Sequence, residues 1–443
     1  MTTLDGISNT SELIDNPEPY LIVSGDSHAG PMPASLREYC PARYIQDFDD
    51  WVATSDTAPP DFFGIRDGQD VAPSGLAPEA LAEGRATLAR VRVNAGSYDS
   101  AARLADMDSD GVTAEVIFAG AMNDQNLPWM GVRPDAGDAN ISPELRSVSC
   151  EIWNRWLSDF CSAAPERFVG VMQIPIFDVP RAVEAVRWGA EHGLRAINFA
   201  APRPDYPAYN NEVYEPLWSA VEEVGVPLLT HSASGENPPG MDGRGAAAIW
   251  MSELMWLSRR GLGQMIFGGV FDRHPGLRLG FVEQRGNWVR QTLDELDSVF
   301  LGAPRNGTIP LLGGVVELPN RLPSDYFRTN CMVADSFMAP FEAAMRHDIG
   351  IENLMWGTDY PHVEGTWPRT KLALRNTFSG VPEADVRIIL GANGVRFFDL
   401  DENALRPTAD RIGPRPEEIV VPLAADEFPL FRSLAFREVG SFH

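Results

Sequence analysis

Several apolar runs of this sequence end in side chains that can bind a metal ion. The first run ends in the residues VSGDSH at positions 23–28. Because side chains alternate along a strand, Asp26 and His28 project to the same side, as a pair of metal ligands would. The structural alternative for this motif taken alone is an Asp that caps a turn beside a surface His.

Three further runs end in the same way. His231 closes one run just before a loop rich in Ser and Gly, and Glu283 follows another. Asp359 ends a third run, and His362 lies shortly after it. A buried carboxylate without a partner is costly, so Glu283 and Asp359 would each need a cation or a proton. Taken singly, each of these residues also has a structural explanation.

Short apolar or β-branched runs alternate with longer amphipathic stretches from residue 20 onward, which predicts βα units and a parallel sheet. Eight such runs predict a closed (β/α)₈ barrel, the TIM barrel fold of the α/β class. The predicted strands are Tyr20–His28, Val112–Ala119, Phe168–Ile176, Leu194–Ala200, Val226–His231, Leu277–Glu283, Tyr326–Val333 and Leu354–Asp359. The stretches between them, such as Pro143–Ala164 and Val179–Glu191, repeat apolar residues at helical spacing and are the predicted outer helices.

The C-terminal ends of the strands of a parallel barrel meet at one mouth, where reactive side chains stand. The polar residues that end the runs therefore converge, and this convergence predicts a metal site. Its predicted ligands are Asp26, His28, His231, Glu283 and Asp359. A ligand set of three carboxylates and two imidazoles suits zinc, iron(II) or manganese better than a soft metal ion that prefers thiolate ligands.

The same alternation divides the chain into three parts. We predict an N-terminal extension at residues 1–19, the barrel at residues 20–405 and a C-terminal tail at residues 406–443, which packs on a neighbouring chain or on the barrel. Residues 40–96 are rich in Pro, Gly, Asp and Ala and have no clear strand. An insertion after the first strand would lie over the mouth, so we interpret it as a partial lid. The alternative is a disordered or outward-facing loop.

The composition excludes several classes of partner. The 443 residues include 62 Asp and Glu against 36 Lys and Arg, a formal net charge of -26 that repels nucleic acid and anionic lipid surfaces. The four cysteines are far apart in the sequence, which predicts neither a zinc ribbon nor a disulfide scaffold. We find no secretion signal and no run that approaches the ~18 apolar residues of a membrane span. We therefore expect a cytoplasmic homodimer whose partner is a small-molecule substrate.

Longer motifs around these residues resemble a known family. They are DSH at 26–28, His231, FDRHPGLR at 271–278, WGTDYPH at 356–362 and GANGVRFF at 391–398. Their order and spacing are similar to those of the amidohydrolase-related branch of the amidohydrolase superfamily, which also contains aminocarboxymuconate semialdehyde decarboxylase. The resemblance implies a (β/α)₈ barrel that holds one or two divalent metal ions.

Comparison with the family pattern also implies roles for single residues. His28, His231 and Asp359 match positions of metal ligands. Asp26 stands where many relatives carry the first His of an H-x-H motif, and Glu283 stands where the decarboxylases carry an acid/base His. The missing His weakens a decarboxylase interpretation, whereas a carboxylate at this position could bind or bridge a second metal ion.

These observations favour a metal-dependent hydrolase, in which the metal lowers the pKa of bound water toward ~7 and polarises a carbonyl group. Amide, ester, lactone and thioester substrates all suit this chemistry. Asp359 would position the water and move its proton, and His231 and Glu283 complete the predicted catalytic set. Arg285 and His362 are the predicted substrate-binding residues.

Two other functions are open at this point. The first is non-oxidative decarboxylation of a cyclic or aromatic carboxylic acid, with His362 or Glu283 supplying the proton to carbon. The second is a non-catalytic barrel that binds a metal or a ligand.

Overall fold

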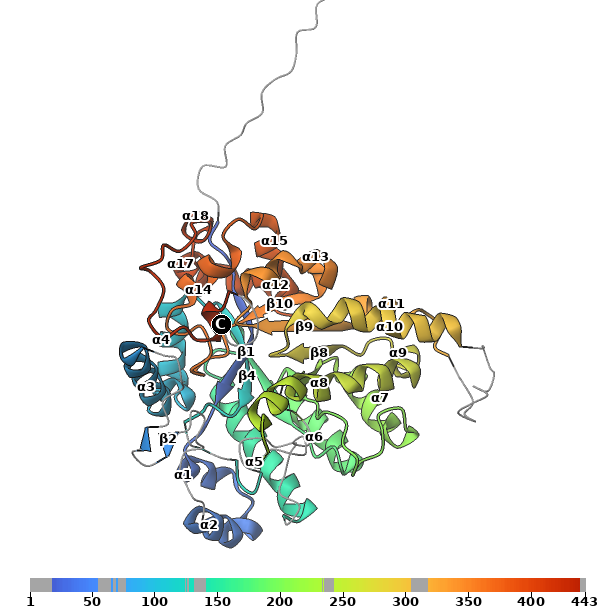
Figure 1. The fold of residues 1–443 in the computed structure, drawn as a ribbon. Helices are drawn as coiled ribbons and strands as arrows, with labels where there is room; N and C mark the ends of the chain where they lie inside the picture. Colours follow the sequence, from blue (N-terminus) through green and yellow to red (C-terminus); the bar gives the residue numbers. More distant parts are fainter. Residues whose placement is uncertain are drawn as a thin grey trace, which may run out of the picture.

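Eight parallel strands form a barrel at the centre of the molecule, and helices surround it (Figure 1). The computed structural model describes residues 18–54, 65–66, 69–70, 77–123, 125, 127–130, 141–232, 234, 243–303 and 318–438. The predicted (β/α)₈ barrel is confirmed.

The barrel strands pair with one another in chain order. They are β1 (Val23–Ala29), β4 (Ala114–Ala119), β5 (Phe168–Gln173), β6 (Ala196–Asn198), β7 (Leu228–His231), β8 (Leu279–Val282), β9 (Cys331–Ser336) and β10 (Leu354–Gly357). Two short strands, β2 (Ile65–Arg66) and β3 (Gln69–Asp70), form a separate antiparallel pair.

The first and last strands close the barrel. Ser27 and Tyr360 form a parallel bridge. The N–H of His28 donates to the carbonyl of Tyr360 at 2.6 Å, and the N–H of Asp359 donates to the carbonyl of Asp26 at 3.1 Å. We call this set of contacts the closure seam. It lies at the C-terminal ends of the strands, among the predicted metal ligands.

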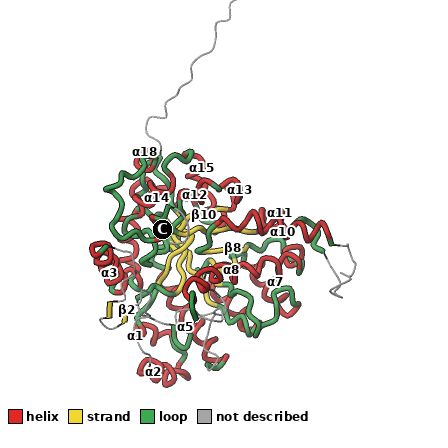
Figure 2. Tube along the Cα trace, viewed as in Figure 1, coloured by secondary structure: helices red, strands yellow, loops and turns green. Residues whose placement is uncertain are grey.

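The helices form a ring outside the strands (Figure 2). They are α1 (Pro33–Leu36), α2 (Ile45–Thr54), α3 (Pro78–Arg92), α4 (Ser100–Asp110), α5 (Pro143–Cys161), α6 (Val179–Glu191), α7 (Glu215–Val224), α8 (Ala246–Phe267), α9 (Val270–Arg273), α10 (Val289–Gly302), α11 (Pro323–Asn330), α12 (Pro340–Ala344), α13 (Arg346–Ile349), α14 (Thr370–Phe378), α15 (Glu383–Arg387), α16 (Asn393–Phe397), α17 (Glu402–Ile412) and α18 (Pro416–Ile419). The side chains of Asp99, Ser142 and Asp178 cap α4, α5 and α6 by accepting hydrogen bonds from backbone N–H groups.

The period-two alternation of the strands builds two apolar layers. Val116, Leu229 and Val282 pack with one another inside the barrel. Their sequence neighbours Leu228 and Phe281 belong to the larger layer between the strands and the helices. Burying one such side chain contributes about 1.5–3 kcal/mol, so both layers hold the strand ends in place.

One predicted strand differs from the structure. The run Tyr326–Val333 was expected to be a single strand, but its first part belongs to α11 and β9 extends to Ser336. Tyr326 and Phe327 are buried on the helix, so an apolar stretch of a buried helix was mistaken for a strand. The end of this strand was therefore placed three residues too early.

Parts of the predicted insertion and tail contact each other. In α3, Glu83 Oε2 accepts a hydrogen bond from the N–H of Phe431 at 3.0 Å, and Glu83 also pairs with Arg369. Most of the segment at 55–76 lies outside the described residues, as do residues 1–17 of the N-terminal extension and 439–443 of the tail. The lid interpretation stays a prediction. In the described part of the chain, no helix is long and apolar enough to cross a lipid bilayer.

We expect a pH-dependent loss of stability at Asp110, the last residue of α4. Burial raises the pKa of Asp110 to about 7, against the hydrogen bonds that Thr370 donates to it. An unfolded Asp has a pKa of about 3.9, so protonation favours the folded state. This stability is fully present below about pH 4 and is lost as the pH rises through about 7, by at most about 4 kcal/mol. In Asp110→Asn, the free energy of unfolding measured by chemical denaturation should change less between about pH 4 and about pH 7 than in the unaltered protein. An unchanged pH dependence would contradict this assignment.

Candidate metal centre

The ends of β1, β7 and β10 bring four of the predicted ligands together. Asp26 Oδ1 lies 3.3 Å from Nε2 of His28 and 3.3 Å from Nε2 of His231. His28 Nε2 also lies 3.3 Å from Asp359 Oδ1. Asp26 and Asp359 are fully buried, and His28 is 4% exposed. Asp26 and His28 lie on the same side of β1, as the sequence pattern predicts, although the pairing of β1 with β4 shifts register between Ser24 and Ser27.

Backbone carbonyls determine which nitrogen of each histidine carries the proton. His28 Nδ1 lies 3.0 Å from the carbonyl of Ala119, and His231 Nδ1 lies 2.9 Å from the carbonyl of Ser232. A carbonyl only accepts, so each Nδ1 must donate. In the neutral imidazole, the lone pair is then on Nε2, which faces the carboxylates of Asp26 and Asp359. Second partners of this kind are usual for metal-binding histidines.

The donor set fits a divalent metal ion. Imidazole lone pairs and carboxylate oxygens face one another across about 3.3 Å, an arrangement of acceptors that requires a positive charge between them. Among the described residues, His28 Nε2 and Asp359 Oδ2 are buried and have no hydrogen-bond partner. When no metal is bound, a proton can supply the charge. Burial lowers the pKa of His231, but Asp26 and Glu283 raise it to about 9.

Glu283 lies on the other side of His231. Its Oε2 is 3.4 Å from His231 Nδ1, and it accepts a hydrogen bond from Ser232. Burial and the charges of Asp359 and Asp26 together raise the pKa of Glu283 to about 8, against the lowering effect of His231. The structure therefore places Glu283 beside the four other predicted ligands, in a position where a neutral carboxylic acid is favoured.

His362 lies behind Asp359. Its Nδ1 is 2.8 Å from Asp359 Oδ1, its Nε2 is 2.7 Å from the carbonyl of Gly120, and its ring stacks on His28 with centroids 4.0 Å apart. Burial lowers the pKa of His362, but Asp359 raises it to about 10. His362 thus orients the Asp359 carboxylate. Its predicted role in substrate binding stays a prediction.

Sequence reasoning missed two side chains of the site. Ser336 Oγ donates to Asp26 Oδ2 at 2.6 Å, and it ends β9. The rule that strand ends carry the site would have found Ser336 if the end of that strand had been placed correctly. Glu364 offers a carboxylate oxygen within 4.8 Å of those of Glu283 and Asp359. It follows His362 by two residues in the same loop, a position that carried no signal in the sequence.

Arg285 takes part in a different cluster. Its Nε lies 4.0 Å from Glu342 Oε1, and Glu342 also pairs with Arg437 of the C-terminal tail. Asp335 Oδ2 accepts a hydrogen bond from the N–H of Gly286 at 3.0 Å beside this group. The structure thus shows a local acid within reach of Arg285. Its predicted contact with a substrate stays a prediction.

Three neighbouring strand ends carry residues with positive φ. Glu283, Phe337 and Asp359 have φ of 54°, 45° and 55°. A non-glycine residue in this region costs on the order of 1–3 kcal/mol and persists only where its surroundings hold it. Such residues cluster at functional sites. The residues that follow β8, β9 and β10 are therefore strained at the barrel mouth, where the candidate ligands meet.

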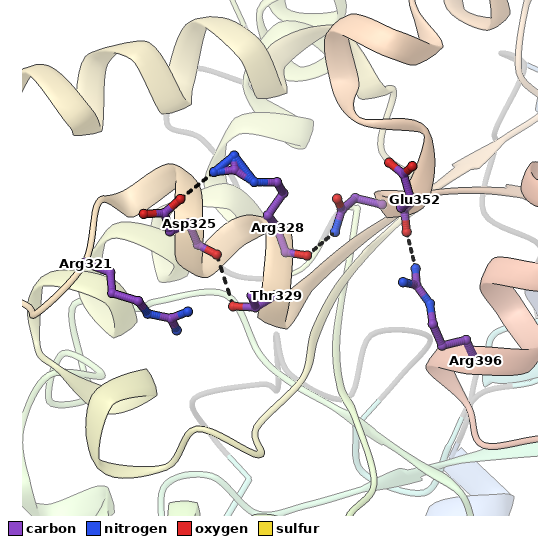
Figure 3. Close-up of a pocket in the computed structure, with 7 residues that line it drawn as sticks. Arg321, Asp325, Arg328, Thr329, Glu352 and Arg396 are labelled. Carbon is purple, nitrogen blue, oxygen red and sulfur yellow. Dashed lines mark hydrogen bonds and ion pairs between the residues drawn. The ribbon is translucent and has the colours of Figure 1, made fainter.

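A cavity of about 410 Å³ lies at the opposite end of the barrel (Figure 3). Its walls include Arg328 and Thr329 shortly before β9 and Asn353 directly before β10. These positions are at the N-terminal ends of the strands. The cavity is therefore separate from the candidate metal centre.

Comparison with known proteins places the chain in a family. The sequence model of the amidohydrolase family matches residues 136–400. The chain belongs to the amidohydrolase family. Gamma-resorcylate decarboxylase of Rhodococcus jostii (strain RHA1) is 26% identical over 266 residues, which cover 54% of this chain and 75% of that protein. The 2-amino-3-carboxymuconate-6-semialdehyde decarboxylase of Dictyostelium discoideum is 24% identical over 258 residues, 56% and 66% of the two chains.

The fold of this amidohydrolase is also that of a solved decarboxylase. The 5-carboxyvanillate decarboxylase of Novosphingobium aromaticivorans DSM 12444, complexed with manganese and 4-hydroxy-3-methoxy-5-nitrobenzoic acid, aligns with a TM-score of 0.58 at 18% identity. The alignment covers 86% of this chain and 96% of that protein. The resemblance to the decarboxylase-containing branch of the superfamily is confirmed, and the protein is a metal-dependent enzyme of this superfamily.

The prediction of hydrolysis was wrong. The relatives are decarboxylases, so they support the alternative function and not the hydrolysis that we predicted. Neither hydrolase nor thioesterase activity has support. The error came from treating position 283 as the loss of an acid. Burial and the neighbouring carboxylates raise the pKa of Glu283 to about 8, so the absence of a histidine at position 283 does not exclude a group that holds a proton there.

We expect protein purified without chelator to carry one or two divalent transition-metal ions per chain, because the converging lone pairs need a cation. Elemental analysis measures the metal directly. Removing it with chelator at neutral pH should lower the thermal unfolding midpoint, since binding energy that favours the folded state is lost. Absence of metal from freshly purified protein would contradict the assignment.

Ser336→Ala should weaken metal binding about 10-fold, within the range seen when a side chain that orients a metal ligand is removed. The hydroxyl holds Asp26 Oδ2 and leaves Oδ1 directed at the two histidines. Ser147→Ala is the matched control, because this buried hydroxyl donates to the carbonyl of Pro143 within α5. Titration of metal-free protein with Mn²⁺ measures both variants. Equal affinities in both would show that Ser336 has no part in the site.

Proposed function

We propose that the protein is a metal-dependent, non-oxidative decarboxylase of an aromatic carboxylic acid. The observation that carries the proposal is the converged set of Asp26, His28, His231 and Asp359, flanked at the mouth by Glu283. The activities of the relatives support it, because they act on aromatic or related unsaturated acids. The substrate is a small molecule.

The four converging side chains would hold the metal, with manganese as the first candidate because the related carboxyvanillate decarboxylase contains it. When bound, a divalent ion supplies a positive charge that orients an anionic substrate and stabilises negative charge during the reaction. His28 and His231 present their Nε2 atoms because their Nδ1 atoms donate to backbone carbonyls. Ser336 and His362 orient the two aspartates.

The chain's own contribution to the chemistry is a proton. Decarboxylation breaks the bond between the ring carbon and the carboxylate, leaves the electron pair on that carbon and releases CO₂. One proton must then reach the carbon. We assign this proton to the Glu283 carboxyl group, which lies beside His231 and near the carboxylate of Asp359. A donor held within reach of the reacting carbon typically contributes 10²–10⁴-fold to the rate.

Asp359 and His362 have a supporting role in this proposal. The carboxylate of Asp359 is fully buried, and His362 Nδ1 holds its Oδ1 at 2.8 Å. Glu364 lies close to both acids and 3.9 Å from His362 Nδ1. This group can return a proton to Glu283 after each turnover, because its members lie within a few ångströms of one another.

The test is a decarboxylation assay with Mn²⁺-loaded protein and hydroxybenzoic acids, starting with γ-resorcylate and 5-carboxyvanillate. We expect stoichiometric CO₂ and, in D₂O, one deuterium on the carbon that carried the carboxylate. Mass spectrometry and headspace analysis measure both products. If the protein binds these acids tightly with no CO₂ release, the non-catalytic barrel becomes the better interpretation.

Glu283→Gln separates proton transfer from metal binding. The substitution keeps the size of the side chain and removes the acidic proton, so we expect the rate to fall at least 100-fold while metal content stays unchanged. Elemental analysis and the CO₂ assay give the two readouts. Loss of metal together with rate would instead make Glu283 a ligand, as the sequence pattern predicted.

A further inference from the structure

The ligands on β1 and β10 are joined by the closure seam, and one buried arginine lies against it. Arg103, in α4, is 0% exposed. Its Nη1 donates to the carbonyl of His28 at 2.9 Å and to the carbonyl of Gly96 at 3.0 Å. Its Nη2 donates to Ser27 Oγ at 2.9 Å. Arg103 therefore binds both the backbone carbonyl of His28, a candidate metal ligand, and the side chain of its neighbour Ser27.

The same guanidinium also contacts the other side of the seam. It lies 4.0 Å from the centroid of the Tyr360 ring, and Tyr360 directly follows Asp359. The carbonyl of Tyr360 accepts the seam hydrogen bond from His28 N. The Tyr360 hydroxyl donates to Asp106 at 2.6 Å, one turn further along α4. A single helix, α4, thus contacts both sides of the closure seam.

The charge of Arg103 has one buried partner. Nε donates to Glu115, which is 1% exposed and lies on β4 next to β1. The neighbours of Glu115 in the sequence, Ala114 and Val116, belong to the inner apolar layer, so Glu115 faces outward from the barrel. The pair therefore lies between the barrel wall and α4, outside the metal centre itself.

We propose that Arg103 is a positioning residue for the metal centre: it fixes the ends of β1 and β10 against each other and so sets the spacing between His28 and Asp359. The proposal rests on the metal site of the proposed function. An arginine suits this role because its planar group offers five donors in a rigid arrangement, which here reach four acceptors and stack on an aromatic ring. A lysine keeps the charge but cannot make this set of contacts.

A second buried arginine provides a matched control. Arg167 is 6% exposed, pairs with Asp108 at 2.9 Å and donates to the carbonyls of Thr113 and Val112. Like Arg103, it is a buried guanidinium that pairs with a carboxylate and donates to backbone carbonyls, although the side chain of its partner Asp108 is 30% exposed. It lies at the start of β5, the end of the barrel away from the ligands. A merely structural arginine should behave like Arg167.

The experiment compares Arg103→Lys with Arg167→Lys in the full chain. Metal-free proteins are titrated with Mn²⁺ and with Co²⁺, and the Co²⁺ absorption spectrum reports the ligand geometry. We expect Arg103→Lys to weaken metal binding 10- to 100-fold and to change the Co²⁺ spectrum. Both variants should lower the thermal unfolding midpoint of the metal-free protein by similar amounts. Arg167→Lys, however, should leave the metal affinity and the Co²⁺ spectrum unchanged. Equal metal affinity and spectra in the two variants would overturn the proposal.

Glu115→Gln keeps the proposal testable if Arg103→Lys does not fold. This variant retains Arg103 and a hydrogen-bond acceptor but removes the charge that orients the guanidinium. We expect a smaller loss of metal affinity, of a few fold, and an unchanged affinity would count against the positioning role. If the unaltered protein binds neither Mn²⁺ nor Co²⁺, the metal centre of the proposed function fails, which is a different result from equal binding by the variants.

Discussion

The closure seam between β1 and β10 is the constraint on which the rest of this structure depends. Its two backbone hydrogen bonds are donated by His28 and Asp359, which are themselves candidate ligands. Side chains alternate with a period of two along a strand, so a shift of one residue would turn Asp26 and His28 away from the barrel interior. The bonds that close the barrel are therefore the bonds that align the metal centre.

The electrostatics of the mouth follow from this alignment. Asp26 and Asp359 are fully buried, and Glu283 and Glu364 lie near them, in a chain whose formal net charge is already -26. Burying carboxylates is costly unless cations or protons compensate them. Metal binding, protonation of His231 and the stability of this end of the barrel are thus parts of one equilibrium.

The choice between hydrolysis and decarboxylation depends on where a proton is held. The ligand residues serve either reaction, because both need an anionic or polarised substrate beside a cation. A carboxyl group at position 283 indicates water activation if it is assumed to be ionised. Burial and the charges of Asp359 and Asp26 raise the pKa of Glu283 to about 8, which favours the neutral acid that we propose as the proton donor. Sequence alone does not contain this information, because a pKa depends on neighbours from several strands.

The sequence by itself determined the fold class, the order of the strands and the convergence of Asp26, His28, His231 and Asp359. Strand periodicity is local, and a parallel barrel places the C-terminal ends of its strands together whatever its loops do. Only the tertiary structure decided which nitrogen of each imidazole faces inward, and which distant side chains hold the ligands. Ser336 acts on Asp26 from 310 residues away, and Arg103 binds the His28 carbonyl from 75 residues away. Such contacts depend on how strands and helices pack, and no local pattern of residues records them.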